Sequence, residues 1–134
     1  MTEVKTFREI GLDEKVQRAL AENGFEKPFP IQEAAIPLMH DIIDRCYPKG
    51  GTIIRAMAAK LLINGKIRPH RDTHPSFHAG HRIHVPITTN PRVRFIIDGR
   101  PYRFEVGQAY ELNNQLTHSV ANKGAEDRIT FIFD

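Results

Sequence analysis

After Gly51 the chain is a succession of short apolar segments rich in β-branched residues, separated by Gly, Pro and Asn. Segments of this length, bounded by turn residues, are typical of β-strands. About eight strands are predicted, over residues 52–58, 59–63, 68–72, 82–88, 93–97, 102–106, 109–113 with 119–121 behind a turn, and 128–133. Many short strands at this spacing predict a mainly β domain, either a barrel or a double-sheet jelly roll.

One turn in this region can be predicted by type. Asp98-Gly99 stands between an apolar strand and Arg100. An Asp-Gly pair in this position is a strong signal for a two-residue hairpin turn.

The N-terminal part of the chain follows a helical pattern instead. Apolar residues recur at helical spacing between Leu12 and about Asn23, and a second helix is predicted from Pro30 or Ile31 to about Cys46. Pro37 is expected to kink or split that second helix. We therefore predict a helical segment over residues 1–47 and a β domain over residues 48–134.

Composition narrows the class of protein. The 134 residues are 40% hydrophobic, which suffices for one modest core. The net charge of +3 comes without a basic stripe, so nucleic-acid binding is not expected as the main role. The single cysteine, Cys46, excludes an internal disulfide. The most apolar stretch, residues 53–63, contains Arg55 and Lys60 and is too short to span a bilayer. With no signal-peptide core at the N-terminus, we expect a cytoplasmic protein without a membrane segment.

Histidines cluster in the β region, and two of them point to metal chemistry. In a strand, residues i and i+2 share a face, so His70 and Asp72 are expected to project together. His118, on a distant strand, is a candidate third ligand. Two histidines and a carboxylate on one side of an ion leave positions open, as in the non-heme Fe(II) oxygenases. A His-x-Asp pair alone is also common on a solvated strand, where it binds nothing.

Cationic side chains on apolar strands indicate a binding site for an anion. Arg128 follows His118 by ten residues and begins the last predicted strand. A guanidinium that enters a core strand needs a partner, and its fork suits a ligand carboxylate such as that of a dicarboxylate cosubstrate. Arg82 and His84 share one face of another strand and again favour an anion.

Four stretches, IRPHRD, HRIHVPITTNP, GQAYELNNQLTHSVANKG and DRITFIFD, carry these residues. From about Gly51 to Asp134 the chain resembles the aspartyl/asparaginyl β-hydroxylase family of 2-oxoglutarate-dependent oxygenases. The specific part is the order His-x-Asp, Arg-x-His, His, and Arg ten residues on. The resemblance implies a double-stranded β-helix of the jelly-roll or cupin type. A barrel of this size leaves apolar sheet and edges exposed, so we expect the two N-terminal α-helices to pack outside it.

The resemblance also implies roles for particular residues. Fe(II) would be held by His70, Asp72 and His118, and 2-oxoglutarate by Arg128, Arg82 and His84. Some members of the family lack the carboxylate and use two histidines only, whereas this chain keeps Asp72. No catalytic residue is implied beyond the metal centre. The implied reaction is β-hydroxylation of an Asp- or Asn-like side chain, in a peptide or in a free amino acid.

A few polar residues near these positions have two interpretations. His74 and His78 lie in the loop 73–81 and either line a substrate entrance or remain solvated. Asn113 either reaches the substrate or serves the turn that follows it.

A second resemblance concerns the first 39 residues or so. They are similar to the Q-motif region of DEAD-box RNA helicases, where the aromatic at Phe7 and the glutamine at Gln32 would read adenine. No Gly-rich phosphate loop with its lysine follows, and no DEAD sequence, so ATP hydrolysis is not expected. The chain therefore looks like a junction near Met39 to Asp41, as in a natural fusion, an engineered chimera, or a borrowed helical pair.

Taken together, the sequence predicts an Fe(II)/2-oxoglutarate-dependent dioxygenase acting on a peptide or amino acid. One alternative is a β-helix scaffold that has lost turnover. Another is a nucleotide- or RNA-binding module that acts through the N-terminal segment. A homodimer is one way to cover the exposed sheet edges.

Overall fold

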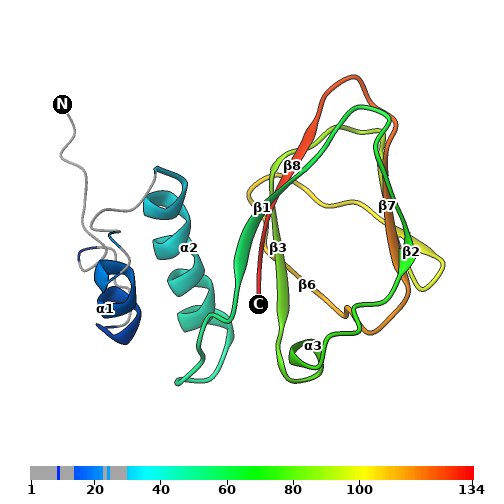
Figure 1. Ribbon diagram of the computed structural model, residues 1–134. Coiled ribbons are helices and arrows are strands. Elements are labelled where there is room, and N and C mark those ends of the chain that lie inside the picture. The colour runs from blue at the N-terminus through cyan, green and yellow to red at the C-terminus, as the bar shows by residue number, and fades with distance from the viewer. Residues whose placement is uncertain (1–8, 10–13, 23, 25–29) are drawn as a thin grey trace. The chain divides into compact units, whose positions relative to one another are not determined.

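The computed structural model describes residues 9, 14–22, 24 and 30–134. The chain divides into two compact units, Met1–Gly51 and Thr52–Asp134. The first unit contains helix α1, Glu14–Glu22, and helix α2, Pro30–Cys46 (Figure 1). Pro37 lies inside α2 without splitting it, because a proline removes only one hydrogen bond of a long helix. None of the helices in these ranges has the length and apolarity needed to cross a membrane.

The second unit is a barrel of two facing sheets, and its described residues contain eight strands and one short helix (Figure 1). These elements are β1 Ala56–Leu61, β2 Lys66–His70, α3 Ser76–Ala79, β3 Arg82–Thr88, β4 Val93–Ile97, β5 Arg100–Tyr102, β6 Tyr110–Leu112, β7 His118–Asn122 and β8 Arg128–Phe133.

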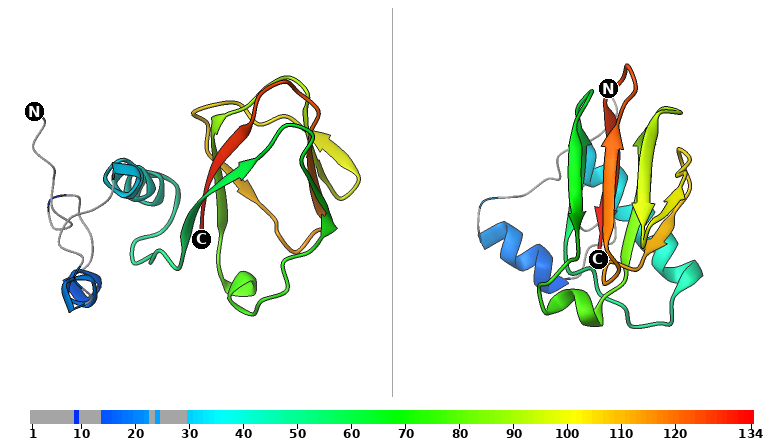
Figure 2. Two further views of the ribbon diagram at one scale, coloured as in Figure 1. Left: turned by 45° about the horizontal axis from the view of Figure 1, so that its top comes forward. Right: turned by 90° about the vertical axis from the view of Figure 1, so that its right-hand side faces the viewer.

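The strand order defines the fold. One sheet has the order β1-β8-β3-β6 and the other β2-β7-β4-β5, and all pairs are antiparallel. The right-hand view of Figure 2 shows the second sheet face-on. Two four-stranded sheets whose strands alternate in this way along the chain form a double-stranded β-helix, or jelly roll. The predicted fold class is therefore confirmed, while the packing of the N-terminal helices on the barrel stays a prediction.

Three predicted strands, 82–88, 93–97 and 128–133, coincide with β3, β4 and β8. The strands predicted at 52–58 and 59–63 are instead one strand, β1, because residues 56–61 pair with β8 in one continuous register. A turn of helix, α3, stands in the loop predicted at 73–81.

The hairpin between β4 and β5 is formed as the Asp-Gly pair predicts. Asp98 has φ 49° and Gly99 has φ 75°. Positive φ at both central residues is the signature of a type I′ turn, which matches the twist of the flanking strands.

The interior of the barrel is apolar and aromatic. Leu61, Phe95, Leu112 and Val120 form its buried centre, with Phe104 packed against them. Leu61 and Leu112 come from one sheet, and Phe95 and Val120 from the other. Among the candidate functional side chains, His84, His118 and Arg128 are buried in this barrel, whereas His70 is exposed.

Candidate metal centre and anion pocket

His70 and His118 face each other across two neighbouring strands. They are Cα partners in the β2–β7 ladder, and their ring centroids lie 4.3 Å apart. Each ring is held by a backbone carbonyl two residues earlier: Nδ1 of His70 lies 2.8 Å from the Arg68 oxygen, and Nδ1 of His118 lies 2.9 Å from the Leu116 oxygen. A carbonyl only accepts, so both Nδ1 atoms carry the proton and both Nε2 atoms keep a lone pair. This is the tautomer that coordination of a metal through Nε2 requires.

Asp72 completes the cluster. Its Oδ1 lies 3.6 Å from His70 Nε2 and 3.8 Å from His118 Nε2. Two donors that share an ion at about 2.1 Å lie within about 4.2 Å of each other, so both distances fit one metal ion. His70 is exposed and His118 is buried, so the cluster has one solvent-facing side. An ion held by these three residues would keep coordination positions for other ligands.

The backbone of Asp72 lies just beyond the end of β2, not within a strand running to residue 72 as predicted. Its N–H donates to the Asn114 carbonyl oxygen at 3.1 Å, and Gln115 Nε2 donates to its carbonyl oxygen at 3.3 Å. Sequence reasoning missed Asn114 and Gln115 in this role. No local signal marks them, since the contacts join segments more than 40 residues apart in the chain.

Arg82 lies beside this cluster with all three guanidinium nitrogens engaged. Nε and Nη2 donate to the two carboxylate oxygens of Asp134 at 2.7 and 2.8 Å, and Nη1 donates to Oδ2 of Asp72 at 2.8 Å. The hydrogen bond to Asp134 is the main reason that the pKa of Arg82 is raised above its ordinary value. Asp134 was not singled out from the sequence, although it shares the β8 face of Arg128 by alternation.

His84 is buried inside the barrel. Its ring lies edge-on to Phe95 and Phe104, and among the described residues neither ring nitrogen has a hydrogen-bond partner. Burial, followed by the nearby Arg128 guanidinium, lowers the pKa of His84 to about 3. The imidazole is therefore neutral at physiological pH and offers one donor and one acceptor to a ligand.

This lowered pKa predicts a loss of stability in acid. The unfolded chain takes up the His84 proton near pH 6.5, whereas the folded chain does so only near pH 3. The contribution is thus complete above pH 6.5 and is lost as the pH falls toward 3, with a slope approaching about 1.4 kcal/mol per pH unit. Urea unfolding at pH 7, 6, 5 and 4 measures this slope, which His84→Gln should reduce. His78→Gln is the control, and equal slopes for wild type and His84→Gln would show that His84 is not the group responsible.

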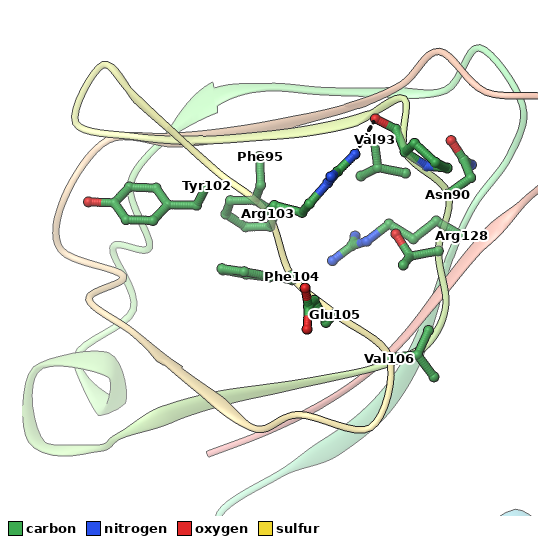
Figure 3. A pocket seen from close by; sticks show the side chains of 11 residues that line it. Asn90, Val93, Phe95, Tyr102, Arg103, Phe104, Glu105, Val106 and Arg128 are labelled. Carbon is green, nitrogen blue, oxygen red and sulfur yellow. Dashed lines mark hydrogen bonds between the residues drawn. The ribbon is translucent and has the colours of Figure 1, made fainter.

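Arg128 supplies an unpaired cation to a pocket at the barrel interior. Its residue is only 4% exposed, Nη2 has no hydrogen-bond partner, and no described carboxylate forms an ion pair with it. Burial lowers the pKa of Arg128 to about 10, which leaves it charged at neutral pH. The pocket has a volume of about 290 Å³, and Figure 3 shows Arg128 extending into it among Val93, Phe95, Tyr102 and Phe104. Arg103 and Glu105 also line the pocket, but Glu105 forms no ion pair with Arg128. A buried cation without an ion-pair partner favours a carboxylate ligand.

The remaining predicted residues lie outside these contacts. His74 contacts Ser76 through Nδ1, and His78 lies in α3, both near the metal cluster in sequence. The side-chain oxygen of Asn113 accepts a hydrogen bond from the Gln115 backbone N–H, which is the turn role considered for it. Phe7 and the side chain of Gln32 lie outside the described residues.

Comparison with known proteins gives one family. A family model described as aspartyl/asparaginyl beta-hydroxylase matches residues 4–134. A search of curated proteins finds no match. The match begins well before Gly51 and includes the N-terminal segment, and nothing in the comparisons bears on the Q-motif resemblance of that segment.

Solved structures of two bacterial proteins are similar to the chain. One is a Cupin 2 conserved barrel domain protein from Salinispora arenicola CNS-205, with 16% identity, a TM-score of 0.47, and coverage of 65% of this chain and 66% of that one. The other is a cupin domain from Bordetella pertussis Tohama I, with 16% identity, a TM-score of 0.49, and coverage of 63% of this chain and 82% of that one.

Proposed function

The chain belongs to the aspartyl/asparaginyl β-hydroxylase family, and from that premise we propose that it is an Fe(II)- and 2-oxoglutarate-dependent dioxygenase. Its substrate would be an Asp- or Asn-like side chain in a peptide or amino acid. The observation that carries the proposal is the cluster of His70, Asp72 and His118, in which the two Nε2 atoms and one carboxylate oxygen lie close enough together to share one ion.

Fe(II) would be held by these three residues. Two imidazoles and one carboxylate suit iron, and they occupy only one side of the ion. The Arg68 and Leu116 carbonyls fix the two rings before any ion arrives, so little side-chain freedom is lost on binding.

The distal carboxylate of 2-oxoglutarate would be bound by Arg128. This pairing would satisfy a buried guanidinium that otherwise has no carboxylate partner among the described residues. His84 is near enough to Arg128 for the guanidinium to lower its pKa, and as a neutral ring it would offer a hydrogen-bonding group without a further positive charge. The stacked rings of Phe95 and Phe104 form an apolar part of the pocket wall, where a lower local dielectric would strengthen the ionic contact.

When bound, Fe(II) and 2-oxoglutarate supply the activation of O₂: one oxygen atom enters a C–H bond of the substrate, and the other enters succinate as CO₂ is released. The residues of this chain would bind and orient the ion and the cosubstrate and would limit the access of water to them. The exposed side of His70 leaves a route by which a substrate side chain reaches the centre.

The first test is an anaerobic titration of the protein with Fe(II) and 2-oxoglutarate. Chelation of the ion by the keto acid should produce a visible charge-transfer absorption band. Glutarate is the matched control, because it carries both carboxylates but no keto group and should give no band. A folded protein that binds Fe(II) and 2-oxoglutarate without the band, or binds neither, would contradict the proposal and leave a scaffold without turnover.

The substrate class is tested separately, once the band is present. Peptides and free amino acids containing Asp or Asn are incubated with the protein, Fe(II), 2-oxoglutarate and O₂. A mass gain of one oxygen atom matched by one succinate per turnover supports the class. Succinate formation that no such substrate stimulates would argue for a different one.

A further inference from the structure

Arg82 joins two buried carboxylates and leaves no nitrogen free. Its side chain is 12% exposed, and its fork engages Asp134 through two bonds while Nη1 bonds Asp72. Bidentate guanidinium–carboxylate pairs are among the strongest and most directional hydrogen bonds in proteins. A guanidinium held in this way is a fixed element of the site.

The consequence for Asp72 is a fixed carboxylate orientation. Arg82 takes Oδ2, so Oδ1 is the oxygen that faces the two histidines. The terminal torsion of an aspartate is broad and roughly two-fold, so the side chain alone does not select this orientation. The Asn114 carbonyl fixes the backbone of Asp72 but does not touch the carboxylate.

Arg82 is also held by the ring of Phe77. Its guanidinium carbon lies 4.3 Å from the centre of the Phe77 ring, and Arg55 stacks on the same ring at 4.4 Å. Arg55 also pairs with Asp134 at 3.2 Å. The two arginines and the two aspartates form a charge-balanced group around Phe77, which accounts for the burial of so many charges together.

We propose that Arg82 is a positioning residue for the metal centre: it orients Asp72 so that Oδ1 points to the ion, and Asp134 holds Arg82 in place. This inference rests on the proposed function, since it assumes that Asp72 is a metal ligand. It assigns Arg82 to the metal carboxylate and leaves Arg128 as the cation available to a cosubstrate. The family resemblance instead implies that Arg82 holds 2-oxoglutarate. In that case the loss of Arg82 would weaken 2-oxoglutarate binding and leave metal affinity unchanged.

The experiment is a titration of the metal-free protein with Co(II) alone, without 2-oxoglutarate, followed by dissociation constant and visible d–d spectrum. Arg82→Gln should weaken Co(II) binding by about 10- to 100-fold, the usual effect of losing a group that orients a ligand. Arg82→Lys retains a charge but not the fork and should give a smaller loss. It also covers the case in which Arg82→Gln does not fold.

Arg55→Gln is the matched control. It removes a stacking contact on Phe77, an ion pair with Asp134 and a hydrogen bond to Ser76, but it does not touch Asp72. Its Co(II) affinity should stay within about threefold of wild type, since it lacks a direct bond to a ligand. A loss as large as that of Arg82→Gln would mean that the whole group acts through packing, and would overturn the specific role of Arg82.

A double variant separates positioning from other effects. If Arg82 acts through Asp72, then adding Arg82→Gln to Asp72→Ala should weaken Co(II) binding by less than about twofold further. A loss that persists in full in the Asp72→Ala background overturns the inference. So does wild-type Co(II) affinity in Arg82→Gln combined with weaker 2-oxoglutarate binding. Wild-type protein that binds no Co(II) or Fe(II) would instead overturn the proposed function, and the inference with it.

Discussion

His118→Ala is expected to abolish Fe(II) binding, with a loss of more than about 100-fold in affinity, while the barrel remains folded. His118 is the buried member of the cluster and brings its Nε2 to within 3.8 Å of Asp72. Its removal leaves one histidine and one carboxylate, too few to hold the ion against water. The backbone ladder between β2 and β7 does not depend on this side chain, so the thermal midpoint of the metal-free protein should fall by only a few degrees.

The measurement is an anaerobic Fe(II) titration on protein whose circular dichroism and thermal unfolding match those of wild type. His74→Ala is the control, because it removes an exposed histidine from the neighbouring loop, where it contacts Ser76 and is not part of the cluster. It should bind Fe(II) as wild type does. Full Fe(II) affinity in His118→Ala would show that the metal assignment is wrong.

The strands and the turn that could be predicted are those whose sequence signals lie within the element itself. β3, β4 and β8 begin and end at the predicted residues, because each is a run of β-branched and aromatic residues bounded by polar or turn residues. The Asp98-Gly99 turn is local as well, since both positive φ values belong to the pair itself. β1 was divided in two because its pairing with β8, which makes it continuous, lies more than 60 residues away.

In the candidate site, too, the residues marked by local spacing could be predicted, and the contacts between distant segments could not. His70 and Asp72 are two residues apart, and spacing alone brings them into consideration. Alternation places Arg82 on an inward face but does not name its partners, and Asp134 lies 52 residues further along the chain. The roles of Asn114 and Gln115 depend on where a loop crosses the end of β2, which no local rule fixes. Long-range polar contacts of this kind require the assembled barrel.

Arg128→Met is expected to separate binding from stability. The substitution replaces a buried guanidinium, which has no carboxylate partner among the described residues, with a flexible apolar side chain that fills much of the same space. The desolvation that lowers the Arg128 pKa to about 10 is a cost of keeping this charge in the folded state. Without that cost, the free energy of unfolding of the ligand-free protein should rise by about 1–3 kcal/mol.

The same variant should lose 2-oxoglutarate. A charge-assisted bond to the ligand carboxylate contributes about 2–3 kcal/mol, so affinity should fall by about 30- to 150-fold, while Fe(II) binds as in wild type. Arg103→Met is the matched control, because Arg103 also lines the pocket but is exposed and donates to the Pro91 carbonyl. Urea unfolding measures the change in stability, and a titration of the Fe(II)-loaded protein with 2-oxoglutarate measures the change in affinity independently.

A variant that is less stable than wild type, yet still binds 2-oxoglutarate, would mean that Arg128 serves the core and that the cosubstrate anchor lies elsewhere. An anion site predicts that Arg128→Met gains stability in the ligand-free protein and loses 2-oxoglutarate binding. In such a site the folded protein holds a buried charge whose partner, the carboxylate, arrives with the cosubstrate.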